Sequence, residues 1–136
     1  YKFEAGTPHI SGAIALGAAI KWMESVGLEN IAAHELALTK YAHEKLLQIE
    51  GLRIYGTADT KAGVVSFLVE GTHPSDLGTL LDQLGVAVRT GHHCTEPLMD
   101  WYKIPGTVRA SFGAYNTFDE IDALVAALER AIKMLK

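Results

Sequence analysis

The chain has 136 residues, a net charge of −4 at pH 7, 49% hydrophobic residues and 21% charged residues. This length suits one domain, and this composition is typical of a globular protein with a continuous core. The 12 lysines and arginines are scattered among 16 acidic residues, which argues against a nucleic-acid surface and against a basic helix on a membrane. We therefore expect no nucleic acid and no membrane among its partners.

The single cysteine, Cys94, excludes a disulfide within the chain and fits a reducing compartment, so we expect a cytoplasmic protein. The most apolar run, residues 10–20, is too short to span a bilayer and follows Glu4 rather than a basic segment. The chain begins at Tyr1, inside what looks like ordered sequence. We therefore expect residues 1–136 to be a single domain from a longer protein.

The first part of the chain predicts two helices. Residues 12–26 are apolar on most sides, which predicts a well-buried helix that ends at Gly27. Residues 28–50 place apolar side chains on one stripe and charged side chains opposite, which predicts an amphipathic helix that ends before Gly51. The stripe consists of Ile31, Leu38, Ala42, Leu46 and Ile49.

The rest of the chain mixes strands and helices. Short strands are predicted over residues 52–55, 64–69, 86–89 and 107–112. A short amphipathic helix over residues 77–84 lies between the second and third strands, and a final helix follows Thr117, which forms a capping box with Glu120. This order predicts an α+β fold, in which a small, mostly antiparallel sheet has helices packed on one side.

The most informative segment surrounds Cys94, where a predicted strand gives way to Gly91 and then to a polar loop. Loops held by a rigid strand are common positions for catalytic groups. Nearby imidazoles, or Arg89, would favour the thiolate, which is the nucleophilic form of the side chain. A buried, structural cysteine is the alternative, because free cysteine is among the most commonly buried residue types.

The two adjacent histidines of this loop, His92 and His93, point in different directions whether the backbone is extended or helical. His92 and Cys94 alone fall short of a closed zinc site, and no spaced Cys or His pair completes one. We therefore predict no metal site, and expect the histidines to shape the loop by hydrogen bonding.

Two other segments carry candidate ligand-binding groups. Arg109 lies on a predicted strand, on the face opposite Val108 and Ala110, where its guanidinium suits bidentate binding of a carboxylate. A surface salt bridge is the alternative. Thr7 precedes a predicted helix and offers a hydroxyl to a phosphate, although such a residue is more often a helix cap. No lysine lies in an evident buried pocket that suits a Schiff base.

Together these segments resemble the C-terminal part of SufS-type cysteine desulfurases, which belong to the class V aminotransferase family. The resemblance covers essentially the whole chain, and the string Arg-Thr-Gly-His-His-Cys is specific to this branch. His9, Thr95 and Glu96 depart from the family pattern, and the last two bear on docking of a sulfur acceptor. The matching segments, in chain order, are residues 3–8, 88–94, 97–99, 108–111 and 115–117.

The resemblance implies a fold type I enzyme that binds pyridoxal 5'-phosphate as a homodimer, with this chain as its smaller C-terminal domain. It implies L-cysteine or L-selenocysteine as substrate, a persulfide on Cys94, L-alanine as product, and a SufE-type acceptor that supplies iron–sulfur cluster assembly. Arg109 matches the arginine that holds the substrate carboxylate. Arg89 matches a second active-site arginine, which binds the substrate or orients the cysteine loop. Thr7 matches a threonine that reaches the cofactor phosphate of the neighbouring protomer.

The family's Schiff-base lysine belongs to the preceding large domain, so the isolated chain is expected to bind no cofactor and to be inactive. Two other interpretations stay open. The parent could be a class V relative with different chemistry, such as a kynureninase-like enzyme or an aminotransferase, although the thiol in the matched loop speaks against this. The chain could also be an interaction module in which Cys94 is structural.

Overall fold

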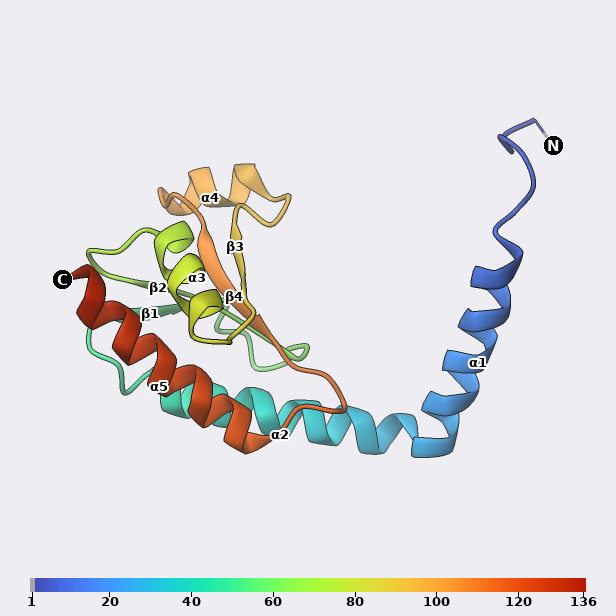
Figure 1. Ribbon diagram of the computed structural model, residues 1–136, viewed down its shortest axis with the longest axis horizontal. Coiled ribbons are helices and arrows are strands. Elements are labelled where there is room, and N and C mark those ends of the chain that lie inside the picture. The colour runs from blue at the N-terminus through green and yellow to red at the C-terminus, as the bar shows by residue number, and fades with distance from the viewer. Residues whose placement is uncertain (1) are drawn as a thin grey trace. The chain divides into compact units, whose positions relative to one another are not determined.

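The computed structural model describes residues 2–136 (Figure 1). It divides into two compact units, the first ending at Ala33 and the second running from His34 to Lys136. The second unit contains the sheet, the cysteine loop and both candidate arginines.

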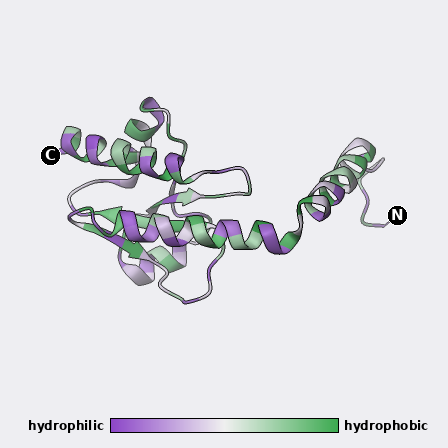
Figure 2. Cartoon of the chain, turned by 90° about the horizontal axis from the view of Figure 1, so that it is seen from below, coloured by the Kyte–Doolittle hydropathy of each residue, from purple (hydrophilic) through white to green (hydrophobic). Residues whose placement is uncertain are grey.

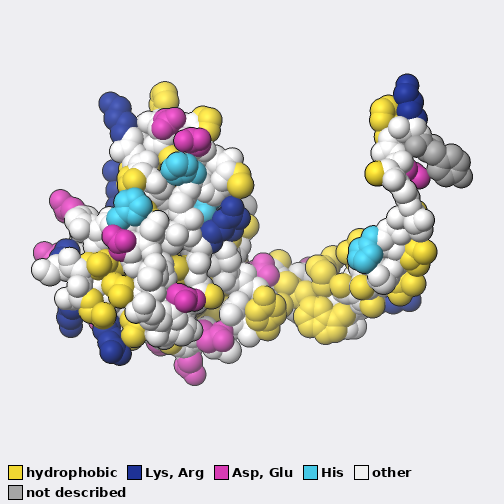
Figure 3. All heavy atoms as spheres, turned by 45° about the horizontal axis from the view of Figure 1, so that its top comes forward, with side chains coloured by type: hydrophobic (Ala, Val, Ile, Leu, Met, Phe, Trp, Pro, Cys, Tyr) yellow, Lys and Arg dark blue, Asp and Glu magenta, His cyan; other side chains and the backbone are white. Residues whose placement is uncertain are grey.

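The first unit holds an entry loop, helix α1 (Ile10–Val26) and the beginning of helix α2 (Leu28–Leu46). Helix α1 ends at Gly27 as predicted, where a φ of 92° lets the backbone N–H donate to the carbonyl of Met23. The expectation that this helix is well buried is wrong. None of its residues is buried, and apolar atoms line its surface in Figure 3. Its own unit contains too few elements to cover a helix that is apolar on most sides.

The second unit is built on a four-stranded antiparallel sheet with the order β1-β2-β4-β3. This confirms the predicted α+β class and the antiparallel pairing. Two strands have the predicted bounds, and β4 lacks only the last predicted residue. The strands are β1 (Leu52–Tyr55), β2 (Val64–Val69), β3 (Arg89–Gly91) and β4 (Thr107–Ser111).

Strand β3 differs from the prediction, which placed it at residues 86–89. Val86 and Val88 of that range are half-buried against the core, but they do not pair with a strand. Pairing with β4 begins at Arg89, opposite Arg109, and ends at Gly91, opposite Thr107. The hydrogen-bonded strand therefore lies in the more polar part of the segment, because its bounds are set by its register with β4.

Three helices pack against one face of the sheet, namely α2, α3 (Pro74–Gln83) and α5 (Phe118–Leu135). Each contributes side chains to a single core with alternate residues of β2 and β4. Leu38, Leu81 and Leu128, one from each helix, are fully buried with Phe67 of β2. Hydrophobic and hydrophilic residues alternate along α5 in Figure 2, as expected for a helix with one buried side.

The end of α2 and the start of α3 were both predicted too far along the chain. Helix α2 ends at Leu46 rather than at residue 50, because the N–H groups of Gln48 and Ile49 bond to carbonyls three residues back. Helix α3 begins at Pro74 rather than at residue 77. There the His73 ring accepts a hydrogen bond from the N–H of Ser75, and proline suits the first turn.

Helix α4 (Glu96–Tyr102) was not predicted. It follows the cysteine loop directly and has Pro97 in its first turn. At its other end Lys103 adopts the left-handed conformation, with a φ of 55°. Its Tyr102 ring meets Tyr55 of β1 edge-on, with ring centroids 5.3 Å apart. Tyr55 lies on the sheet face opposite the core, so this contact brings α4 to that second face.

The predicted capping box of the last helix is present. The hydroxyl of Thr117 accepts from the N–H of Glu120 at 3.3 Å, and the Glu120 carboxylate accepts from the N–H of Thr117 at 2.9 Å. The amide of Asn116 also donates to this carboxylate. These hydrogen bonds lower the pKa of Glu120, that from Asn116 most.

An ion pair joins helices α2 and α5. Lys45 lies 2.9 Å from the Asp122 carboxylate, and the Tyr41 hydroxyl donates to the same group. These hydrogen bonds, that of Lys45 first, lower the pKa of Asp122, while the pKa of Lys45 is raised. The contribution of Asp122 to stability is therefore complete above its ordinary pKa of 3.8 and is lost as the pH falls through its lowered value. That of Lys45 is complete below its ordinary pKa of 10.5 and is lost as the pH rises through its raised value.

We expect Asp122→Asn to lower the thermal midpoint of the chain slightly at pH 7. The difference from the unsubstituted chain should shrink as the pH falls below the ordinary pKa of 3.8 and disappear once the pH lies below the lowered pKa of Asp122 in the folded chain. Thermal unfolding followed by circular dichroism between pH 2 and pH 8 measures this. Glu129→Gln, on the same helix and without an ion pair to the described residues, is the matched control. A pH-independent difference would contradict the assignment.

Candidate active site

The cysteine loop connects β3 to α4 and has an unusual backbone. His93 and Cys94 are consecutive non-glycine residues with positive φ, 55° and 64°. The loop closes on itself at Thr95, whose N–H and hydroxyl both donate to the carbonyl of His92. The side chain of Cys94 is thereby presented at the surface, where it is exposed. The alternative of a buried, structural cysteine does not describe this residue.

The thiol has a cationic neighbour. Nη2 of Arg89 lies 3.5 Å from Sγ of Cys94 and donates toward it. Arg89 is the first residue of β3, so its backbone is fixed by the ladder with β4. The strand and the loop therefore bring a thiol and a permanent positive charge together.

Arg89 and Arg109 face each other directly across the β3–β4 ladder. Side chains directly opposite each other in an antiparallel pair project to the same face, and like charges there are destabilising by themselves. Neither arginine forms an ion pair with a described residue, and Nε of Arg109 is buried without a hydrogen-bond partner. The surface salt bridge considered for Arg109 is therefore not seen. Two unpaired guanidinium groups at one place suit an anionic ligand.

Arg109 lines a hollow of about 290 Å³ on the sheet face opposite the core. Its lining includes Tyr55 of β1 and Ser66 of β2, together with Met99 and Tyr102 of α4. Most of this lining is apolar, so a carboxylate bound there would interact with the guanidinium in partly dehydrated surroundings, where charge-assisted hydrogen bonds are stronger.

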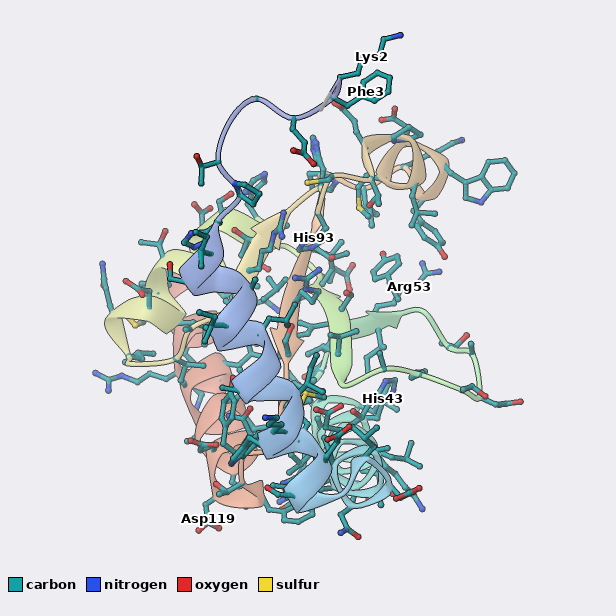
Figure 4. All side chains as sticks on the ribbon, turned by 90° about the vertical axis from the view of Figure 1, so that its right-hand side faces the viewer. Lys2, Phe3, His43, Arg53, His93 and Asp119 are labelled. Atoms are coloured by element: carbon teal, nitrogen blue, oxygen red, sulfur yellow. The ribbon has the colours of Figure 1, made fainter. Side chains whose placement is uncertain are left out.

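His93, labelled in Figure 4, ties the cysteine loop to β4. Its Nε2 lies 3.1 Å from the carbonyl oxygen and 2.8 Å from the hydroxyl of Thr107. Burial lowers the pKa of His93, the bond to Thr107 opposes this, and the charges of Arg109 and Arg89 lower it further. His92 lies differently: it is exposed, with Nδ1 3.8 Å from the Glu96 carboxylate. We expected the histidines to shape the loop by hydrogen bonding, and His93 does form such a hydrogen bond, to Thr107.

Thr7, the candidate contact to a cofactor phosphate, lies far from the cysteine loop in the sequence. Thr7 is in the exposed entry loop, and its hydroxyl forms no hydrogen bond to the described residues, so it is available to a phosphate. A Cβ built on the neighbouring Gly6 meets no atom within 4 Å, so this loop leaves open space. The buried polar side chains of residues 2–136 are Thr39 and Thr107, so no described lysine has the buried surroundings of a Schiff-base lysine.

Residues 2–136 contain no group of three or more His, Cys, Asp or Glu side chains placed to hold a metal ion. In the same range, every helix is too short or too polar to cross a membrane.

Sequence comparison finds that the profile of the family described as Aminotransferase class-V matches residues 1–124. A probable cysteine desulfurase of Halalkalibacterium halodurans is 51% identical over 130 residues, which is 96% of this chain and 32% of that protein. A cysteine desulfurase of Serratia proteamaculans is 49% identical over 135 residues, which is 99% of this chain and 33% of that protein. The chain spans about a third of the length of these curated relatives.

Two solved structures of cysteine desulfurases share this fold. That of CsdA from Escherichia coli, in an S-sulfonic acid form, superposes with a TM-score of 0.90 at 37% identity and covers 99% of this chain and 33% of that one. The apo enzyme of Thermococcus onnurineus superposes with a TM-score of 0.90 at 44% identity and covers 97% of this chain and 33% of that one. The chain belongs to the aminotransferase class-V family. Within that family it is similar to about a third of each of these cysteine desulfurases.

Proposed function

We propose that the full-length protein carrying this chain is a SufS-type cysteine desulfurase that uses pyridoxal 5'-phosphate. It converts L-cysteine to L-alanine, forms a persulfide on Cys94, and passes the sulfur to a SufE-type acceptor for iron–sulfur cluster assembly. We further propose a cytoplasmic homodimer that also accepts L-selenocysteine. The observation that carries the proposal is the exposed thiol of Cys94 beside Arg89, with the unpaired Arg109 directly across the ladder.

Each of these residues has a separate role in the proposed reaction. Arg109 binds the substrate carboxylate with its guanidinium, and Arg89 contacts the substrate or orients the cysteine loop through its contact with Sγ of Cys94. Pyridoxal phosphate, when bound, supplies the electron sink for the substrate carbon, and Thr7 of the neighbouring protomer binds one of its phosphate oxygens. The thiolate attacks the substrate sulfur, so that a sulfur–sulfur bond forms and the carbon–sulfur bond breaks. The electron pair of the broken bond stays with the carbon, which takes up a proton to give L-alanine.

This proposal is tested by comparing the full-length protein with the isolated chain. With pyridoxal phosphate and L-cysteine, the full-length protein should produce L-alanine repeatedly in the presence of a thiol reductant. The isolated chain of residues 1–136 should produce none and should show no saturable absorbance band of a cofactor bound to lysine, because no described lysine is buried. A full-length protein that transfers an amino group from L-cysteine but leaves its sulfur in place would instead support the aminotransferase alternative.

A further inference from the structure

The backbone of the cysteine loop needs something to hold it. Non-glycine residues with positive φ are uncommon, and two in succession persist only where neighbouring contacts determine them. In this loop they are His93 and Cys94, with φ of 55° and 64°. The turn formed by Thr95 and His92 lies within the loop itself, so it does not fix the loop relative to the sheet.

The contact that fixes the loop to the sheet runs through the ring of His93. A carbonyl oxygen only accepts, so the 3.1 Å contact between Nε2 and the Thr107 carbonyl requires Nε2 to carry the hydrogen. The Thr107 hydroxyl, 2.8 Å from the same nitrogen, is close enough to share this hydrogen. Nδ1 then carries no hydrogen in the neutral ring, and it is buried without a partner among the described residues. Thr107 is itself 1% exposed and is held in β4, so it is a rigid anchor.

A second close contact keeps the loop near β4 at the same place. A Cβ on Gly106 would lie 2.8 Å from the carbonyl carbon and oxygen of Gly91. Both glycines have positive φ, 106° for Gly91 and 132° for Gly106. The two backbones therefore approach to a distance that only glycine permits, next to the His93–Thr107 bond.

The His93–Thr107 bond lies between the two parts of the proposed site, Cys94 on one side and Arg109 on the other. Thr107 and Arg109 are two residues apart on β4, so they project to the same face. His93 borders both the hollow that contains Arg109 and the open depression that contains Cys94 and Arg89. The ring therefore lies between the proposed nucleophile and the proposed carboxylate site.

We propose that His93 is a positioning residue: its Nε2–H bond to Thr107 fixes Cys94 at a set distance from the substrate held by Arg109. The neutral ring is required only as a donor and takes no part in proton transfer. This inference rests on the proposed function, since it concerns how the same nucleophile is placed.

The test uses the full-length protein with three substitutions. His93→Ala removes the bond, His93→Gln restores an amide N–H close to the position of Nε2, and His92→Ala changes the exposed histidine of the same loop as a control. With L-cysteine, the alanine variant should lose about 10- to 100-fold in kcat, because small displacements of a reacting group have effects of this size. KM should change less than about threefold, since Arg109 is untouched. The glutamine variant should recover most of kcat, and the control should stay within about twofold.

Hydrogen exchange of the cofactor-free protein supplies a readout that does not depend on activity. The peptide covering residues 91–99 should exchange faster in His93→Ala than in the parent, and at nearly the parent rate in His93→Gln and His92→Ala. An alanine variant with parental kcat, or a glutamine variant no better than alanine, would overturn the proposal.

If His93→Ala folds poorly, the bond is tested by a substitution of its acceptor, Thr107. Thr107→Val keeps the shape of the anchor and removes its hydroxyl, and it should lower kcat about three- to tenfold at constant KM. Because the carbonyl of Thr107 still accepts from Nε2–H in this variant, an unchanged kcat would overturn the part that the hydroxyl has in the anchor. Cys94→Ser separates this inference from the proposed function: if that variant is inactive while His93→Ala is fully active, only the role of His93 is wrong.

Discussion

Cys94→Ser in the full-length protein is expected to reduce desulfuration of L-cysteine at least about a thousandfold. A serine hydroxyl is a far poorer attacker of a soft sulfur atom than a thiolate, and Arg89 cannot compensate for this difference. Turnover is measured as L-alanine formed from L-cysteine. L-Selenocysteine should be affected much less, because its weaker carbon–selenium bond breaks without attack by the enzyme.

Binding should survive this substitution. Cys94 is exposed on its loop, whereas Arg109 is positioned by β4, so the serine variant should bind pyridoxal phosphate and L-cysteine as the parent does. The change in cofactor absorbance on adding L-cysteine reports this. A serine variant that desulfurates L-cysteine at the parent rate would show that Cys94 is not the nucleophile. Loss of cofactor binding would show instead that the substitution has disturbed the protein more widely.

Arg109→Ala is expected to weaken the use of L-cysteine far more than the binding of pyridoxal phosphate. Loss of a charge-assisted, bidentate contact costs about 2–4 kcal/mol, which corresponds to tens- to several-hundred-fold in kcat/KM. The side chain has no ion-pair partner among the described residues, so its removal breaks no ion pair there that supports the fold. Steady-state kinetics and cofactor titration measure the two effects separately.

A matched control for this substitution is Arg130→Ala on α5, an exposed arginine that has no ion-pair partner among the described residues. That variant should keep kcat/KM within about threefold, as is usual for surface substitutions. If Arg109→Ala has the same kcat/KM as the parent, Arg109 does not bind the substrate carboxylate.

Much of the fold could be predicted from local patterns. The strands Leu52–Tyr55 and Val64–Val69 have the predicted bounds, because alternating apolar residues between turns specify a half-buried strand locally. The capping box of Thr117 and Glu120 was also recognisable, since both partners lie within one turn. Local patterns were misleading where distant contacts decide the outcome. Strand β3 follows its register with β4, and the apolar helix α1 is exposed although its composition predicted burial.

The site was predictable in part for the same reason. The exposed position of Cys94 follows from its polar neighbours, and the sequence therefore indicated it. The direct pairing of Arg89 with Arg109 depends on the register of two strands that are far apart in the chain, and no local pattern contains it. Helix α4 had a usable signal, since Thr95 and Pro97 occupy positions typical of a helix start. No sequence signal indicated the bond from His93 to Thr107, because this bond depends on the left-handed backbone of the loop.

The central claim, that Cys94 receives the substrate sulfur, is tested most directly by locating that sulfur during turnover. The full-length protein is given L-cysteine without a sulfur acceptor, the reaction is trapped with an alkylating reagent, and the peptides are analysed by mass spectrometry. Our account predicts that the peptide containing Cys94 gains one sulfur atom, in proportion to the first equivalent of L-alanine released. L-Alanine released without any added sulfur on that peptide would contradict it.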